Sequence, residues 1–187
     1  MRKKNYKFNS KKLVARNKRF KVYFDNLNIE GKSINDFLMI RPIVQKKNKI
    51  VGVCVIPEHK KKYGLMRVWR HQFNQFLWQV PAGFVEKNEN ITFTAIKELI
   101  EETGLKCEKK NLRYIGEMIP DAGLLQGKVV LYLGLNCKKI TNKITPEIGV
   151  DKICFFSKLK VQRMLKENKI LSASSFIALT RALNYEI

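Results

Sequence analysis

Long apolar runs are missing from this chain of 187 residues. No stretch approaches the ~20 apolar residues that cross a bilayer, and the charged start MRKKNYKFNSKK is not followed by the apolar segment of a secretory signal. We therefore expect a cytoplasmic protein that does not span a membrane. The chain also has no internal repeat and no linker rich in Pro, Gly or Ser, which argues against a string of separate domains.

Cysteine pairs at metal-binding or redox spacing are missing as well. The four cysteines, Cys54, Cys107, Cys137 and Cys154, are far apart in the sequence, and none forms a CxxC pair. Three of the four have apolar neighbours. We interpret them as reduced packing residues rather than as a disulfide framework or a zinc site.

Acidic residues are scarce, with 16 Asp and Glu against 37 Lys and Arg, for a net charge of +21. Such a charge favours contact with polyanions. However, Lys far outnumbers Arg, whereas a selected phosphate-binding surface favours the two-pronged Arg. We therefore do not expect specific nucleic-acid binding, although a basic surface would steer nucleotides toward a site.

Five of the scarce acids lie between Gly83 and Leu105: Glu86, Glu89, Glu98, Glu101 and Glu102. At about 100° per residue, the apolar residues of this stretch fall on one arc of a helix, and Glu98, Glu101 and Glu102 gather on the other side. Asn90 is a suitable N-cap, and Gly104 is a suitable left-handed C-cap. Like charges one turn apart repel, and a hard cation such as Mg²⁺ or Mn²⁺ would reverse that repulsion. The alternative is an ordinary solvated acidic face.

The same stretch has a recognisable spacing, Gly-x5-Glu-x7-Lys-Glu-Leu-x-Glu-Glu-x-Gly-Leu, from Gly83 to Leu105. This spacing resembles the signature of the Nudix hydrolases, which cleave pyrophosphate bonds of nucleoside diphosphates linked to another moiety. The family has Arg where this chain has Lys97. A narrower similarity, to the ADP-ribose pyrophosphatase branch, is carried by the stretches VWRHQF, QVPAGFVE and KENKILSASSFIAL. Pro120, which lies 15 residues after the end of the signature at Leu105, also fits this branch.

Alternation and periodicity predict strands and helices along the whole chain. Strands are expected within 12–29 (two), 37–45, 49–57, 63–73, 112–118, 128–137 and 152–156, and helices at the acidic stretch, 159–168 and 172–185. The fold class is α/β. The resemblance implies a Nudix-type α/β/α sandwich with a mixed sheet over residues 43–187, preceded by a small β-region at 11–42 and a basic, mobile tail at 1–10. In the related branch the β-region exchanges between subunits, so a homodimer is expected.

The resemblance also implies roles for individual residues. Metal ligands would be the Ala82 carbonyl and the carboxylates of Glu98, Glu101 and Glu102, and Gly83 would allow the close approach of the loop. Lys97 would orient the carboxylates of the signature. Arg70 would contact phosphate, and Phe84 would form a wall of the substrate site.

The catalytic base is left open by the sequence. Glu147 is the only acid between Asp121 and Asp151 and lies in a stretch with Pro and Gly, TNKITPEIGVDK. Asp151 and Glu101 are the alternatives.

These residues predict a divalent-metal-dependent hydrolase of ADP-ribose or a related nucleoside diphosphate sugar, which releases a nucleoside monophosphate and a sugar phosphate. One alternative keeps the chemistry but changes the substrate to dinucleoside polyphosphates, coenzymes or capped RNA. The other is a Nudix domain that binds nucleotides without catalysis, against which the intact Glu98, Glu101 and Glu102 argue.

Overall fold

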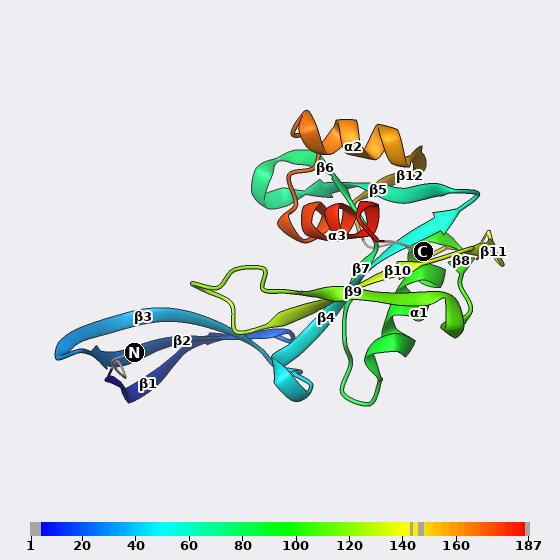
Figure 1. Ribbon diagram of the computed structural model, residues 1–187. Coiled ribbons are helices and arrows are strands. Elements are labelled where there is room, and N and C mark those ends of the chain that lie inside the picture. The colour runs from blue at the N-terminus through cyan, green and yellow to red at the C-terminus, as the bar shows by residue number, and fades with distance from the viewer. Residues whose placement is uncertain (1–4, 143, 146–147, 186–187) are drawn as a thin grey trace. The chain divides into compact units, whose positions relative to one another are not determined.

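The computed structural model describes residues 5–142, 144–145 and 148–185 (Figure 1). It divides into two compact units. The first contains the described residues up to Val51 and the segment Ile119–Lys128, and the second contains Gly52–Met118 and the described residues from Val129 onward. No helix in the described ranges is long and apolar enough to cross a membrane.

The first unit is built on an antiparallel sheet of three long strands, β1 (Tyr6–Arg16), β2 (Phe20–Ile29) and β3 (Lys32–Pro42). The turn between β2 and β3 has positive φ at Glu30 (54°) and Gly31 (84°), the backbone that suits a tight hairpin. The segment Ile119–Lys128 runs along β3, where the amide of Ile40 donates to the carbonyl of Leu124 at 2.8 Å.

Two boundaries expected from the sequence differ in the structure. The basic tail expected over residues 1–10 is part of β1 from Tyr6 onward, because alternate apolar residues such as Tyr6 and Phe8 extend the pairing with Ile29 and Leu27. The segment Ile119–Lys128, expected within 43–187, belongs to the first unit because it bonds to β3.

The second unit carries a seven-stranded sheet in the order β12-β5-β4-β10-β9, with β6 paired to β5 and β7 paired to β4. Its strands are β4 (Ile50–His59), β5 (Lys62–Arg70), β6 (Gln75–Gln79), β7 (Ala82–Phe84), β9 (Leu112–Met118), β10 (Lys128–Gly134) and β12 (Val150–Ser157). A separate pair is formed by β8 (Leu105–Lys106) and β11 (Lys138–Lys139). The helices are α1 (Ile91–Thr103), α2 (Lys158–Lys166) and α3 (Ala173–Leu183).

Helices cover both faces of this sheet (Figure 1). Alternate residues of β4 and β10 share one core with α2 and α3: Cys54, Ile56, Leu131, Leu133, Met164 and Leu179. On the opposite face, a Cβ placed on Gly134 would lie 3.4 Å from the side chain of Leu99 in α1. The α/β/α sandwich expected from the sequence is therefore confirmed.

Candidate active site

Helix α1 carries the acidic residues, and its ends are capped as the sequence predicts. The side chain of Asn90 accepts a hydrogen bond from the amide of Phe93 at 2.6 Å. Gly104 has φ 69°, and its amide donates to the carbonyl of Ile100. Both caps satisfy backbone groups that a helix end would otherwise leave without partners.

Glu102 lies on the inner side of the helix, so its expected place on the acidic side was wrong: at about 100° per residue it falls between Ile91 and Ala95. Glu102, expected on the acidic side away from the core, is only 3% exposed. Its Oε2 accepts a hydrogen bond from the amide of Ala82 at 3.0 Å, which compensates part of the cost of its burial. Its position on the helix turns Glu102 inward, beside buried Ala95, and the amide of Ala82 supplies its hydrogen-bond donor.

The backbone at Gly83 lies directly against Glu98. A Cβ added to Gly83 would be 2.0 Å from Oε1 of Glu98 and 2.1 Å from its Cδ, so no larger residue fits without displacing that carboxylate. Gly52 in β4 allows a second close approach, because its Cβ would lie 2.8 Å from the carbonyl oxygen of Gly83. Gly52 could not be identified from the sequence, since only the pairing of β4 with β7 brings it beside this loop.

A salt bridge supports the outer side of the helix. Nζ of Lys97 lies 2.9 Å from Oε1 of Glu89, and Oγ1 of Thr94 donates to the other carboxylate oxygen at 3.1 Å. The hydrogen bond from Lys97 lowers the pKa of Glu89. The same bond, followed by the charges of Glu89, Glu101 and Glu98, raises the pKa of Lys97 against the opposing effect of burial.

Two of the three candidates for the catalytic base lie within the described residues. Glu147 lies outside the described residues. Asp151 forms a salt bridge with Arg67 at 3.0 Å. Glu101 is half-buried on α1, and its carbonyl accepts a hydrogen bond from the amide of Thr145 at 2.7 Å. That bond holds one point of the segment after β11 against the acidic helix.

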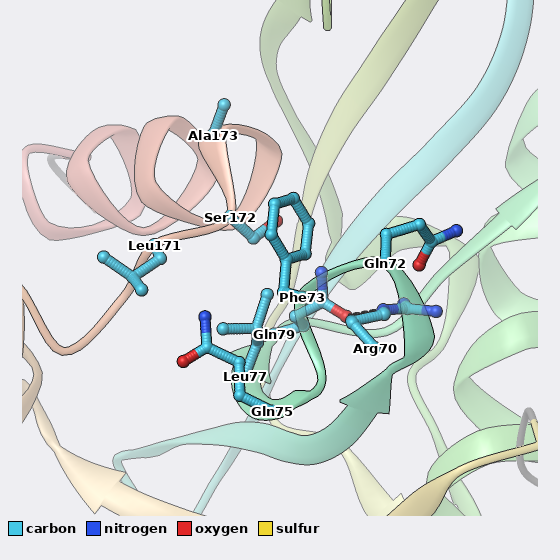
Figure 2. A pocket seen from close by; sticks show the side chains of 9 residues that line it. All are labelled: Arg70, Gln72, Phe73, Gln75, Leu77, Gln79, Leu171, Ser172 and Ala173. Carbon is cyan, nitrogen blue, oxygen red and sulfur yellow. Dashed lines mark hydrogen bonds between the residues drawn. The ribbon is translucent and has the colours of Figure 1, made fainter.

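Arg70 lines a pocket of about 580 Å³ in the second unit (Figure 2). Its Nε donates to Oε1 of Gln79 at 2.7 Å. Side chains of and between β5 and β6 form one wall, and the start of α3 forms another: Arg70, Gln72, Phe73, Gln75, Leu77, Gln79, Leu171, Ser172 and Ala173. Phe84 is 39% exposed and is not part of this lining. The sequence singled out Arg70 but missed Gln79 and Phe73, since their approach to α3 depends on the tertiary fold.

The donor set at Ala82, Glu98 and Glu102 consists only of oxygen atoms. Within the part of the chain that the structure describes, no three His, Cys, Asp or Glu side chains form a ready metal-binding cluster. That finding is compatible with Mg²⁺, which proteins usually bind through one or two carboxylates while waters and substrate phosphates complete the shell. The oxygen donors present here therefore fit a hard divalent cation.

Comparison with known proteins places this geometry in context. The family model described as "NUDIX domain" matches residues 46–176. A crystal structure described as an ADP compounds hydrolase superposes with a TM-score of 0.79 at 14% identity, over 96% of this chain and 92% of the other. At that identity the likeness shows the fold.

Two curated relatives align over different shares of the chain. A methanol dehydrogenase activator of Bacillus methanolicus is 24% identical over 143 residues, which is 74% of this chain and 73% of the relative. An 8-oxo-dGTP diphosphatase of Buchnera aphidicola subsp. Schizaphis graminum is 42% identical over 64 residues, which is 34% of this chain and 39% of the relative.

Proposed function

Because the chain belongs to the Nudix hydrolase family, we propose that it cleaves the pyrophosphate bond of ADP-ribose or a related nucleoside diphosphate sugar. The products would be a nucleoside monophosphate and a sugar phosphate. The observation that carries the proposal is the contact between the Ala82–Gly83 backbone and the carboxylates of Glu98 and Glu102. Nudix hydrolases generally use divalent metal ions, and this is where the chain offers oxygen ligands.

Glu98, Glu102 and the carbonyl of Ala82 would hold the cation, either Mg²⁺ or Mn²⁺, and Glu101 would contribute through a second ion or a water. A divalent cation at this place supplies neutralisation of phosphate charge and activation of the attacking water. The hydrogen bond from the amide of Ala82 to Glu102 ties the loop to the helix, so the proposed ligand oxygens of both would keep a fixed spacing. Lys97, held by Glu89, would orient the neighbouring carboxylates.

The pocket at Arg70 would receive one end of the substrate. A volume of about 580 Å³ lies within the roughly 300–1,000 Å³ typical of small-molecule sites. Gln79 fixes the plane of the Arg70 guanidinium through Nε, and a fixed guanidinium favours paired hydrogen bonds to phosphate oxygens. Phe84, whose side chain is exposed, would form a wall of the substrate site on the side of the carboxylates.

A panel of nucleotides tests the substrate class. The protein is incubated with ADP-ribose, other nucleoside diphosphate sugars, dinucleoside polyphosphates, coenzymes, capped RNA and 8-oxo-dGTP, each with Mg²⁺ or Mn²⁺. Release of a monophosphate and a sugar phosphate from ADP-ribose, lost in Glu98→Gln, supports the proposal. Preference for capped RNA or a dinucleoside polyphosphate would support the alternative substrates, and no turnover of any compound would support the non-catalytic alternative.

The same assay addresses the base. Replacing the general base should lower kcat by about 10²–10⁴-fold and flatten the acid limb of the pH profile. Glu147→Gln, Glu101→Gln and Asp151→Asn are compared with the parent, and Asp151→Asn also breaks the salt bridge to Arg67. The variant that loses the acid limb identifies the base.

We also propose a homodimer built on the three-stranded sheet. The strand register places Tyr6, Phe8 and Leu13 on one face of this sheet, and each of them is at least half exposed. On the same face the buried Oδ1 of Asp25 has no hydrogen-bond partner among the described residues. An exposed apolar face is more stable when another chain covers it, and a donor from that chain would satisfy the carboxylate of Asp25.

Sedimentation velocity at moderate salt tests the dimer. Phe8→Ser should weaken it, whereas Lys7→Ser, one position along β1 and on the opposite face, serves as the control. A mass near 21.9 kDa that does not change with concentration would refute the dimer.

A further inference from the structure

Three serines stand at the start of the C-terminal helix α3. Ser172 occupies the N-cap position, but its side chain makes no capping bond to the helix backbone. Its Oγ instead lies 3.1 Å from Oγ of Ser174 and accepts a hydrogen bond from Oγ of Ser175 at 3.3 Å. Hydroxyls at the N-cap ordinarily bond to the helix's own first amides, whereas the hydroxyl of Ser172 bonds to the other two serines.

Ser175 has such a partner in another part of the chain. It is 1% exposed, and its Oγ accepts a hydrogen bond from the amide of Val80 at 3.1 Å, across 95 residues of sequence. Val80 is itself buried, so its amide would have no access to water if this acceptor were removed. The hydroxyl of Ser175 therefore fixes Val80, the first residue of the connection between β6 and β7.

The two residues that follow Val80 are fixed in the same way by other elements. The carbonyl of Pro81 accepts from the amide of Val55 in β4 at 2.9 Å, and the amide of Ala82 donates to Glu102 in α1 at 3.0 Å. Three consecutive residues are thus held by three separate elements. Together these bonds fix the chain that leads to the Ala82 carbonyl, the oxygen proposed to bind the cation.

We propose that Ser175 is a positioning residue for the segment Val80–Gly83, which carries the proposed metal ligand Ala82, and that it acts through its hydrogen bond with Val80. Ser172, which receives the hydrogen bond from Ser175, also lines the Arg70 pocket (Figure 2), so the serine cluster joins the candidate substrate pocket to the candidate metal site. The inference rests on the proposed function for its catalytic consequence. Its structural part, the fixing of residues 80–83, stands on the hydrogen bonds alone.

Ser175→Ala tests the inference, with Thr180→Ala as the matched control. Thr180 also lies on α3, and its hydroxyl bonds only to the carbonyl of Phe176 on the same helix at 2.8 Å. The first measurement is amide hydrogen exchange of Val80, Ala82 and Gly83 in metal-free protein, since Pro81 has no amide hydrogen. We expect exchange there to accelerate at least tenfold in Ser175→Ala and to stay unchanged in Thr180→Ala.

The second measurement is the dissociation constant for Mn²⁺, followed by electron paramagnetic resonance of the free ion. Loss of groups that orient metal ligands typically costs about 10–100-fold in metal affinity or activity, so we expect at least a tenfold weaker affinity. Where the parent turns over a substrate, kcat should fall by a similar factor while KM changes little. If Ser175→Ala does not fold, Ser175→Cys, which keeps a weak acceptor of similar size, takes its place.

The outcomes separate the two proposals. Unchanged exchange at residues 80–83 would overturn the role of Ser175, whatever the activity. Faster exchange with parental Mn²⁺ affinity would also overturn it, because the loop would then not govern the metal. A parent protein that binds no Mn²⁺ and cleaves no nucleotide would defeat the proposed function itself and, with it, the link from Ser175 to metal.

Discussion

Gly83→Ala offers a direct test of the contact that carries the proposed site. The added Cβ would lie 2.0 Å from Oε1 of Glu98, and ordinary contacts begin near 3.4 Å, so this oxygen must retreat by about 1.4 Å, the difference between the two distances. Metal–ligand distances hold to within about 0.2 Å. Glu98 therefore cannot keep a ligand position while the methyl group is present.

The expected result is a loss of function without a loss of fold. We expect kcat/KM to fall at least about 100-fold, which corresponds to about 2.7 kcal/mol of transition-state stabilisation, and Mn²⁺ affinity to fall with it. Gly83 does not have a positive φ, so alanine should gain about 0.4–1 kcal/mol from the stiffer unfolded chain. That gain offsets part of the cost of moving a half-buried side chain, so the melting temperature should change by only a few degrees.

Activity is measured by nucleoside monophosphate release, and Mn²⁺ binding by titration. Gly123→Ala is the control, because its Cβ would meet only Oδ1 of Asp121 at an ordinary 3.5 Å. If displacement of Glu98 is the cause, Gly83→Ala should add little to Glu98→Gln in the double variant. Parental activity and metal affinity in Gly83→Ala would refute the assignment of Glu98 as a ligand.

Other changes give further tests. Glu102→Gln keeps an oxygen for the amide of Ala82 but removes the charge, so turnover should fall at least about 100-fold while thermal unfolding stays close to the parent. Lys97→Arg should preserve or raise kcat, because the forked guanidinium can bond to two carboxylate oxygens; a large loss would show that the site depends on lysine in another way. Tyr63→Phe should cost about 1 kcal/mol at pH 7, measured by urea unfolding, because the Tyr63 hydroxyl donates to the carbonyl of Ala182 at 3.1 Å. Burial raises the pKa of Tyr63 to about 12, so above pH 10 the unfolded tyrosine ionises first and parent stability falls as pH rises toward 12. The difference between Tyr63→Phe and the parent should shrink over that range, and a constant difference would contradict this account.

Local features of the chain were predictable because they depend on neighbours in sequence. The helix from Ile91 to Thr103, with its caps at Asn90 and Gly104, follows from apolar periodicity and from residues that bond to their own helix ends. The close approach of the loop at Gly83 to the helix was implied by the family resemblance that the spacing from Gly83 to Leu105 carries. The longer strands were also located from their apolar patterns, whereas the short strands β6, β7, β8 and β11 were not predicted.

Contacts between distant segments were not predictable in the same way. No local pattern marks Ser175 as the acceptor for Val80, or Gln79 as the partner of Arg70 opposite the start of α3. The partner of buried Glu102 was also not predictable, because the amide of Ala82, whose hydrogen bond offsets part of the cost of burying the carboxylate, lies 20 residues away.

The sequence by itself determined the chemistry available to this protein: a capped helix that carries three carboxylates behind a glycine loop. The tertiary structure decided how that chemistry is held. It placed β4 under the loop through Gly52, α3 behind it through Ser175, and the segment Ile119–Lys128 beside β3 rather than in the second unit. These contacts depend on how sheet and helix faces pack across long stretches of chain. Such packing is a property of the whole fold and leaves no periodic signal in the residues that take part.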